Sequence, residues 1–484
     1  MQKLTRAEIK AIYDLGPDAV IDLLEQLMRT NEILAQQVAD LKLRVQELEN
    51  QLAQDSHNSS KPPSSDGFKK QTKSLRKPGK NKPGGQKGHR GNTLKRVSSP
   101  DKMLTCSISN CTHCGHSLEH VPVDGYDSRQ VFDIPPVSIE VTEYHAEIKT
   151  CAHCQKINKA SFPEDVTQRT QYGARLKAQM IYLMNQHLIP YERTSDICFD
   201  LYGHRISVGT LYRMNQSCFD VLEKCTADIK EHIINSDVVN FDETGLRVEK
   251  HGHWLHSAST ADCTYYYVHR QRGPVAMDAA DILPHFSGTA VHDHWKSYFT
   301  YKCEHALCNA HHLRELTFIA EQEKQQWAGK MIKLLIEIKH ETDHAKAYGA
   351  ERIDDVIIKE FENQYQKILE DGLKLNPDYD LKRKKKKRTK TQNLLHRLKN
   401  FNEQTLAFMY DLRVPFDNNL AERDIRMMKL HQKISGCFRK KAGAEIFCRI
   451  RGYISTARKQ NWNICQAIQS AVQEYPWRPL LTAE

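Results

Sequence analysis

The stretch that decides the fold is Val238-Val239-Asn240-Phe241-Asp242-Glu243-Thr244-Gly245. Its apolar first half is typical of a buried strand, and we predict that this strand ends at the carboxylate of Asp242. Trp254–Ser259 and Thr264–His269 are rich in aromatic residues and are predicted as the next two strands. A helix is predicted near Val275–Leu283. Strands interspersed with helices favour a domain of the α/β class.

Two further acids, Asp293 and Glu422, are candidates to lie close to Asp242 in the fold. Gly288-Thr289-Ala290-Val291-His292-Asp293-His294-Trp295 predicts another strand that ends at a carboxylate, 51 residues after Asp242. Glu422 follows 129 residues after Asp293, and Asn418 is predicted to cap the helix that carries it. The sequence thus offers three acids that a fold could bring together.

Three clustered acids would suit the cleavage of a phosphodiester bond. Two Mg²⁺ ions held about 4 Å apart activate an attacking oxygen and stabilise the leaving oxygen, and clustered carboxylates are ligands that suit them. The chain contains 60 acidic residues, however, so spacing alone does not single out one trio. Four other acids compete for the role: Glu243, Asp262, Glu315 and Asp424.

Length and composition set the frame for these motifs. A chain of 484 residues predicts about three domains. No stretch approaches the roughly 18 consecutive apolar residues that span a bilayer, and Met1–Arg6 leads into no signal-peptide core. We therefore expect an intracellular protein, cytoplasmic and associated with the nucleoid. Its fourteen cysteines are then expected to bind metal where they cluster, rather than to form disulfides.

Residues 20–52 carry a heptad repeat. One heptad position holds Val20, Leu27, Leu34, Leu41 and Leu48, and the other holds Leu24, Asn31, Val38, Val45 and Leu52. Leucine at one position and a single asparagine at the other are typical of a parallel two-stranded coiled coil. We predict dimerisation through this helix. The alternative is an amphipathic helix packed on its own domain.

The positive charge is concentrated in two segments. Residues 61–96 hold twelve Lys/Arg and one Asp, a net charge of +11, and residues 382–390 hold eight Lys/Arg and no acid. The formal charge of the whole chain is +10, so the rest carries −9. The first segment is predicted to be a flexible basic arm that contacts DNA phosphates through residues such as Lys82, Lys87 and Arg90. The alternative is a solvated linker.

Two C-x-x-C motifs predict a zinc site. Cys111-Thr112-His113-Cys114 and Cys151-Ala152-His153-Cys154 each place two thiolates on a tight turn. Between them, residues 130–135 and 137–148 are predicted as short strands of a zinc-ribbon-like module. Alternative metal donors lie nearby at Cys106, His113, His116 and His153, and four unligated thiols remain the other interpretation.

A helical region follows the zinc motifs. Helices are predicted at Ala174–His187, Tyr191–Leu201 and Val208–Ile229, with Gly203 between the last two and Ser207 as a cap. The last two helices resemble a helix-turn-helix, which would place Thr210, Arg213 and Asn215 near the start of the recognition helix. Two helices joined by a glycine turn are also common in cores, so both interpretations stay open.

Longer motifs point to a family. They are Asp242–Gly245, Val291–Tyr298, His305–Leu316 and Val414–Gly436, together with the Ser-Lys-Pro-Pro-Ser-Ser-Asp segment of the arm. With these motifs the chain resembles, over nearly its whole length, the DDE transposases of insertion-sequence family sixty-six, the TnpC type. The resemblance implies an RNase H-like catalytic domain whose third acid follows a helical insertion. It also implies that Asp242, Asp293 and Glu422 are the metal-binding catalytic acids.

Other residues near these motifs have less specific signals. Cys308, His311 and His312 could bind metal, but packing or positioning of a DNA end is the preferred interpretation. Helix-like segments at Trp327–His340 and Ile353–Gly372 fit the helical insertion. Seven cationic residues follow Glu422 closely and are predicted to line the DNA path, with a solvated basic face as the alternative: Arg423, Arg426, Lys429, Lys433, Arg439, Lys440 and Lys441.

The fold is therefore predicted as multidomain α/β. The predicted parts are a helix and leucine-zipper coiled coil (1–54), a basic arm (55–100), a zinc-binding module (101–165), a helical region (166–232), an RNase H-like domain (233–320 and 413–484) and its helical insertion with a lysine-rich loop (321–412).

We expect an enzyme that uses Mg²⁺ or Mn²⁺ for catalysis and Zn²⁺ for structure. It would cut transposon ends, join them to target DNA and act as a homodimer or higher oligomer, together with accessory proteins of the same element. The alternatives are a zinc-containing DNA-binding regulator without catalysis and an RNase H-like nuclease without strand transfer.

Overall fold

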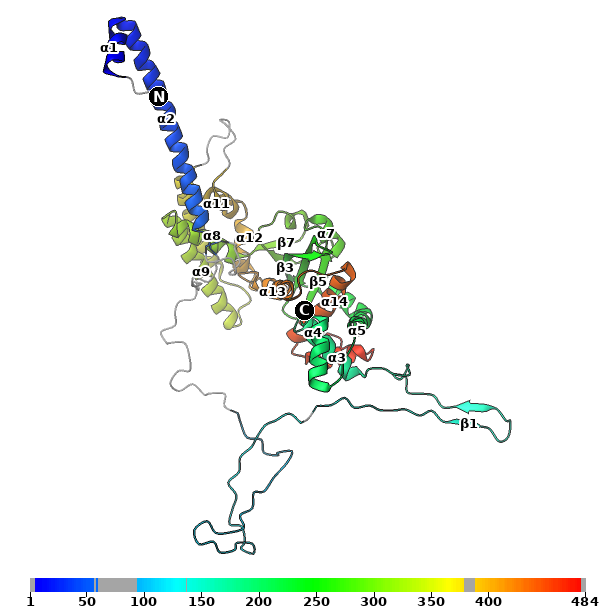
Figure 1. The fold of residues 1–484 in the computed structure, drawn as a ribbon. Coiled ribbons are helices and arrows are strands. Elements are labelled where there is room, and N and C mark those ends of the chain that lie inside the picture. The colour runs from blue at the N-terminus through cyan, green and yellow to red at the C-terminus, as the bar shows by residue number, and fades with distance from the viewer. Residues whose placement is uncertain (1–4, 56–57, 60–93, 136, 378–387, 480–484) are drawn as a thin grey trace. The chain divides into compact units, whose positions relative to one another are not determined.

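The computed structural model describes residues 5–55, 58–59, 94–135, 137–377 and 388–479 (Figure 1). The chain divides into two compact units. One comprises residues 1–73, 172–190 and 213–484, and the other comprises residues 74–171 and 191–212. Most of the basic arm, with Lys82, Lys87 and Arg90, and most of the lysine run lie outside the described residues.

Two helices begin the chain, α1 (Arg6–Asp14) and α2 (Pro17–Leu52). Thr5 and Glu8 form a capping box at the start of α1. Helix α2 spans the whole predicted heptad repeat, and most of its apolar heptad side chains are exposed in the single chain: Leu24, Leu27, Leu34, Val38, Leu41, Val45, Leu48 and Leu52.

The zinc-motif region contains one short hairpin, and its strands differ from the prediction. Strands β1 (Ile148–Thr150) and β2 (Ile157–Lys159) pair in antiparallel fashion around the second C-x-x-C motif. The predicted strands at residues 130–135 and 137–148 are wrong, because their described residues up to 147 form no ladder. Their apolar side chains are exposed, so no buried face holds a sheet together there.

Four helices follow, α3 (Ala174–Asn185), α4 (Tyr191–Tyr202), α5 (Val208–Val221) and α6 (Glu223–Ile234). Ser207 caps α5 as predicted, since its hydroxyl accepts the backbone N–H of Thr210 at 3.2 Å.

The predicted third helix is in fact two, because the chain breaks at Leu222. At this break the carbonyl of Phe219 accepts a hydrogen bond of 2.8 Å from the guanidinium of Arg449. That guanidinium also lies over the Phe219 ring, 3.7 Å from its centroid. A contact from α14 thus accompanies the break, which local periodicity could not reveal.

A five-stranded sheet follows, with the order β5-β4-β3-β6-β7. Strands β3 (Val238–Val248), β4 (His251–Ser259) and β5 (Thr264–His269) are antiparallel neighbours. Strands β6 (Thr289–His292) and β7 (Glu304–Leu307) run parallel to β3. The two residues between β3 and β4, Glu249 and Lys250, both have positive φ, as a tight hairpin turn requires. The central strand, β3, therefore has neighbours on both sides.

Two details of the sheet differ from the prediction. Strand β3 does not end at Asp242 but continues to Val248, because pairing with β4 extends from Asn240↔Ser259 to Val248↔His251. Asp242 thus lies in mid-strand, whereas Asp293 follows the last residue of β6 as predicted. Strand β7 was not predicted, since four residues give too little periodic signal.

Helices surround the sheet and form the insertion. The crossover to β6 contains α7 (Pro274–Ala280), and β7 leads into α8 (Asn309–Glu321). The two helix-like segments of the insertion lie in α9 (Gln326–Ala347) and α10 (Asp355–Leu375), and α11 (Lys390–Asn400) and α12 (Asn402–Tyr410) complete it.

Three helices follow the insertion. Helix α13 (Asn419–Ser435) packs on β3 and β4, α14 (Lys441–Lys459) packs on β5, and α15 (Ile464–Val472) packs on α3. None of the helices within the described residues is both long and apolar enough to cross a membrane.

The core of the insertion is tightly packed where α10 meets α9 and α11. A Cβ atom on Gly372 would lie 2.7 Å from Leu395 Cδ2 and 2.9 Å from a ring carbon of Trp327, whereas one on Gly329 would meet nothing within 4 Å. We expect Gly372→Ala to destabilise the protein by about 1–3 kcal/mol, because the added methyl group would force the packed side chains of Leu395 and Trp327 to shift. Thermal unfolding monitored by circular dichroism should show a lower midpoint.

Gly329→Ala is the matched control, since it makes the same change in α9 without a clash. It should stabilise by roughly 0.5–1 kcal/mol through helix propensity. Equal effects of the two substitutions would contradict the packing described for Gly372.

Candidate functional site

The site begins on the face of β3 that meets α13. Side chains alternate along a strand, so Asn240 and Asp242 share one face and Phe241 and Glu243 share the other. The amide of Asn240 donates a hydrogen bond of 2.8 Å to the side-chain oxygen of Asn418, directly before α13. Asp242 therefore faces the start of the helix that carries Glu422.

Asp293 lies beside Asp242 because of the parallel register. Asn240 pairs with Val291, and both Asp242 and Asp293 stand two residues further along their chains. Each carboxylate accepts a backbone N–H: Asp242 from Glu243 at 2.8 Å, and Asp293 from Trp295 at 2.9 Å. These hydrogen bonds orient the two neighbouring carboxylates.

Glu422 comes from the first turn of α13, where Asn418 has a different role from the predicted one. Asn418 makes no side-chain cap; instead its amide donates to the carbonyl of Phe241 at 2.7 Å. This bond reaches the residue before Asp242 and so fixes the helix start against β3. The side chain of Glu422 is 18% exposed, and its Oε1 is buried with no hydrogen-bond partner among the described residues.

The pKa of Asp242 responds to the charges of Asp293 and Glu422, so the three acids lie near one another. The pKa of Asp242 is raised to about 8, mainly by burial and then by the charge of Glu243. The charges of Glu422 and Asp293 raise this pKa further, against the lowering effect of the Glu243 N–H bond. In the described part of the chain no Lys or Arg forms an ion pair with Asp242 or Asp293, and Arg426 lies 3.9 Å from Glu422. The group is thus acidic and partly buried, and the exposed Arg426 pairs with only one of its three carboxylates.

Glu243, a competitor for the role, is instead neutralised. Its carboxylate accepts hydrogen bonds from Arg272 at 2.8 Å and from the Tyr298 hydroxyl at 2.5 Å. The guanidinium of Arg272 lies over the rings of Trp254 and Trp295, 4.9 and 4.1 Å from their centroids. Glu243 is therefore held on the face of β3 opposite Asp242.

Two of the other competing acids also have cationic partners. Glu315 pairs with Arg397. Asp424 lies 2.7 Å from Lys459 Nζ and also accepts the hydroxyl of Ser259 at 2.8 Å. The protein itself therefore compensates the charge of both acids, unlike that of Asp242 and Asp293.

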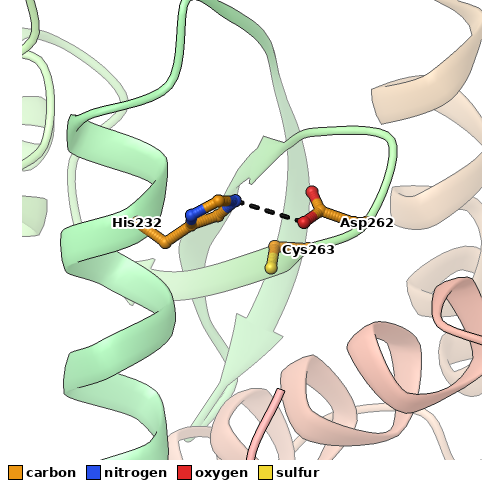
Figure 2. A group of neighbouring side chains, drawn as sticks. All are labelled: His232, Asp262 and Cys263. Carbon is orange, nitrogen blue, oxygen red and sulfur yellow. Dashed lines mark ion pairs between the residues drawn. The ribbon is translucent and has the colours of Figure 1, made fainter. Parts of the chain in front are cut away.

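Asp262, the last competitor, belongs to a separate group (Figure 2). Figure 2 shows His232 on α6 facing Asp262 on the turn before β5, with Cys263 beside them. The His232 ring nitrogen lies 3.2 Å from the carboxylate, which also accepts the Thr260 hydroxyl at 2.5 Å. Lys459 donates to the Cys263 carbonyl at 2.8 Å. These bonds fasten the turn between β4 and β5.

Histidines near the acids do not supply positive charge. Burial lowers the pKa of His292 to about 3 and that of His294 to about 4, so both rings are neutral at pH 7. Burial likewise lowers the pKa of His311 and of His312. These neutral rings therefore do not offset the negative charge of the three carboxylates.

The Cys308, His311, His312 set divides in the structure. His312 is buried and shares a hydrogen bond of 3.1 Å with Asn309, which agrees with the packing interpretation. Cys308 and His311 instead lie next to Glu422, with one ligand atom of each residue within 4.8 Å of the others. Sequence reasoning noted the C-x-x-H spacing but did not connect it with Glu422, because the two segments meet only in the fold.

The two C-x-x-C motifs form equivalent turns. The Cys111 N–H donates to the His116 carbonyl and the Cys151 N–H donates to the Lys156 carbonyl, at 2.8 and 2.9 Å. Hydrogen bonds from following backbone N–H groups, foremost those of Cys114 and Cys154, lower the pKa of Cys111 and of Cys151. Such turns favour thiolates, as zinc ligation requires. Within the described residues, the four sulfurs do not form a group of three donors within 4.8 Å.

Predicted DNA contacts on the helical region are only partly accessible. Arg213 is exposed on α5. Asn215 is 3% exposed and accepts a hydrogen bond of 2.8 Å from the amide of Asn185, so its side chain belongs to the packed interior, in line with the core interpretation of this helix pair. Thr210 shares a hydrogen bond of 2.9 Å with Ser207 at the helix start.

Exposed cations lie on and after α13. Arg423, Arg426, Lys429 and Lys433 are exposed on this helix, and Arg439 is exposed after it. Lys429 Nζ also donates to the carbonyl of Gly245 in β3 at 3.0 Å. The same helix therefore presents Glu422 to the sheet and cations to solvent.

Comparisons with known families agree with this arrangement. The family model "Transposase IS66 family" matches residues 169–446, and the "zinc-finger binding domain of transposase IS66" matches residues 109–155. A family of unknown function, DUF6444, matches residues 5–95. No curated protein matches significantly. The second match spans both C-x-x-C motifs and confirms the predicted zinc-binding module, and because the first covers more than half of the chain, this protein belongs to the IS66 family of transposases.

Proposed function

We propose that this protein is a DDE transposase in which Asp242, Asp293 and Glu422 hold Mg²⁺. It would hydrolyse the phosphodiester at each transposon end and then use the released 3′-OH to attack target DNA. The observation that carries the proposal is the group of three neighbouring acids, in which neither Asp242 nor Asp293 has a Lys or Arg ion-pair partner among the described residues, whereas Glu243, Glu315 and Asp424 each have one.

The residues present fit a hard divalent cation. Carboxylate oxygens are the ligands that Mg²⁺ prefers, and Glu422 Oε1 is a buried acceptor without a partner in the described residues. When bound, the ions would polarise the phosphate and stabilise the attacking and leaving oxygens. The protein's own part is positional: the N–H groups of Glu243 and Trp295 orient Asp242 and Asp293. Arg272 and the Tyr298 hydroxyl hold the carboxylate of Glu243.

The sheet topology supports an RNase H-like catalytic domain. Three antiparallel strands continue into two parallel strands, with β3 in the centre and the acids on β3, after β6 and on α13. The insertion α9–α12 separates the second acid from the third. This is the arrangement that the family resemblance implies.

DNA would be held by cationic residues that precede and follow the three acids in the sequence. Exposed residues Arg423, Arg426 and Lys433 can neutralise phosphates close to Glu422, and the arm at residues 61–96 adds a sequence-independent contact. Binding to DNA would also place the protein at the nucleoid.

Self-association through α2 completes the proposal. The exposed apolar heptad positions of α2 suit a second copy of the same helix, and Asn31 in the repeat would fix the register of the pair. Two copies would let one assembly hold both ends of an element. Accessory proteins of the same element are a further proposed partner.

The acids provide the decisive test. Asp242→Asn, Asp293→Asn and Glu422→Gln should each lower cleavage of labelled end DNA in Mg²⁺ by more than about a hundredfold, because each removes a charge that the reaction needs. Binding of the same DNA, measured by gel mobility shift, should persist.

Glu315→Gln is the control, since that acid is already paired with Arg397, and it should retain cleavage. Full activity in any of the three amide variants would overturn the assignment. Cleavage without joining to a second DNA would indicate a nuclease, and binding without any cleavage a regulator.

The pKa of Asp242 generates a pH prediction. It is raised from an ordinary value of 3.8 to about 8, so the folded chain binds more protons than the unfolded chain. The stability of Mg²⁺-free protein should therefore fall as pH rises from about 4 to about 8. Asp242→Asn removes this penalty and should raise the thermal midpoint by at least about 2 °C at pH 8, and by less at pH 5.

The comparison is made in zinc-containing buffer without Mg²⁺, so that the zinc module stays intact. Added Mg²⁺ should stabilise the unsubstituted protein more than the Asn variant. If Asp242→Asn raised the thermal midpoint by the same amount at pH 5 and at pH 8, this result would contradict the raised pKa of Asp242.

The basic arm should govern the salt dependence of DNA binding. Deleting residues 61–96 removes twelve cations, so the slope of log K against log[salt] should become shallower. Filter binding at several salt concentrations measures the slope. Replacing the arm with an uncharged Gly/Ser segment of equal length controls for linker length, and an unchanged slope would show that the arm does not contact phosphates.

A further inference from the structure

Three donor atoms of different chemistry meet beside α13. One ligand atom each of Cys308, His311 and Glu422 lies within 4.8 Å of the other two. Cys308 follows the last residue of β7 and stands at the N-cap of α8, with His311 in the first turn of that helix. A sulfur, a nitrogen and an oxygen donor are thus gathered from two segments that are far apart in sequence.

The backbone explains why they meet. The His311 N–H donates to the Cys308 carbonyl at 3.2 Å, and residues three apart share one face of a helix. The Asn418 N–H donates to the sulfur of Cys308 at 3.2 Å. One turn later, the Glu422 N–H donates to the Asn418 carbonyl at 3.2 Å. The sulfur is therefore tied to the start of the helix that carries the carboxylate.

Two of the three residues have unsatisfied polar atoms at this place. His311 Nδ1 and Glu422 Oε1 are both buried, and neither has a hydrogen-bond partner among the described residues. Cys308 is 2% exposed. Leaving such atoms without a partner is unfavourable, and a cation bound between them would satisfy both.

We propose that Cys308, His311 and Glu422 form a binding site for a zinc-class divalent ion, with a fourth position open to water or DNA. Thiolate, imidazole and carboxylate together suit Zn²⁺, whereas Mg²⁺ prefers oxygen ligands alone. Binding exchanges the thiol proton of Cys308 for the metal ion, and the proton passes to solvent. This zinc is additional to the one held by the C-x-x-C motifs.

The site deepens the proposed function, because Glu422 is also the proposed third catalytic acid. An ion on Cys308 and His311 would hold one carboxylate oxygen of Glu422 and so set the direction of the other. The two proposals can fail separately, since zinc binding is measured without DNA and without Mg²⁺.

The other cluster with metal-binding residue types does not share this feature. His232, Asp262 and Cys263 also bring ligand atoms within 4.8 Å, but none of their described polar atoms is both buried and without a partner (Figure 2). Cys263 therefore offers a matched control for Cys308, as a buried cysteine in a similar group.

The experiment measures zinc in the full-length protein, purified without chelator and dialysed against zinc-free buffer. We expect about two equivalents per chain. Cys308→Ser and His311→Gln should each lose about one equivalent, and so should Cys111→Ser at the C-x-x-C module. Asp242→Asn and Cys263→Ser should retain both. Circular dichroism and thermal unfolding confirm that each variant is folded.

If Cys308→Ser does not fold, Glu422→Gln serves as the second variant. The Glu422 side chain is more accessible than that of Cys308 and so tolerates substitution better. It should weaken retention of the second zinc during dialysis by at least about tenfold. One equivalent in the unsubstituted protein, lost with Cys111→Ser, would overturn the proposal. So would a second equivalent that is lost with Cys263→Ser and kept in the Cys308 and His311 variants.

Discussion

Asn240 and Asn418 share a side-chain hydrogen bond of 2.8 Å in the interior, and Asn418 donates a second one to the Phe241 carbonyl at 2.7 Å. Both side chains are buried, so these amide bonds form where water does not compete. They fasten the start of α13 to the central strand between Asn240 and Asp242. The position of Glu422 relative to the sheet follows from that attachment, and so does the approach of the Asn418 N–H to Cys308.

Charge compensation distinguishes the competing acids from Asp242 and Asp293, which have no Lys or Arg ion-pair partner among the described residues. Glu243, Glu315 and Asp424 have an Arg or Lys partner, and Asp262 has a histidine partner. These pairs link separate segments of the chain, whereas ionisation of Asp242, whose pKa is raised mainly by burial, makes the fold less stable. Under the proposed function, activity and stability are opposed at this centre, as is common where a site must bind a charged ligand.

Local sequence signals located much of this architecture. Strands around β4 and β5, the helices of the insertion, the two cysteine turns and the position of Asp293 after a strand all follow from short-range patterns. Contacts between distant segments decided the rest. Pairing with β4 carries β3 beyond Asp242, and Arg449 contacts Phe219 close to the break at Leu222. Strand β3 binds the Asn418 side chain that was expected to cap α13.

The insertion between the second and third acids has a consequence for the nascent chain. Asp242 and Asp293 leave the ribosome long before Glu422, which follows Asp293 by 129 residues. At a synthesis rate of about 5–20 residues per second, this interval is on the order of 10 s. During that time β3 and β6 exist without α13, so a chain that is still being made has no complete site. Under the proposed assignment of the three acids, the centre is therefore incomplete until synthesis has passed the insertion.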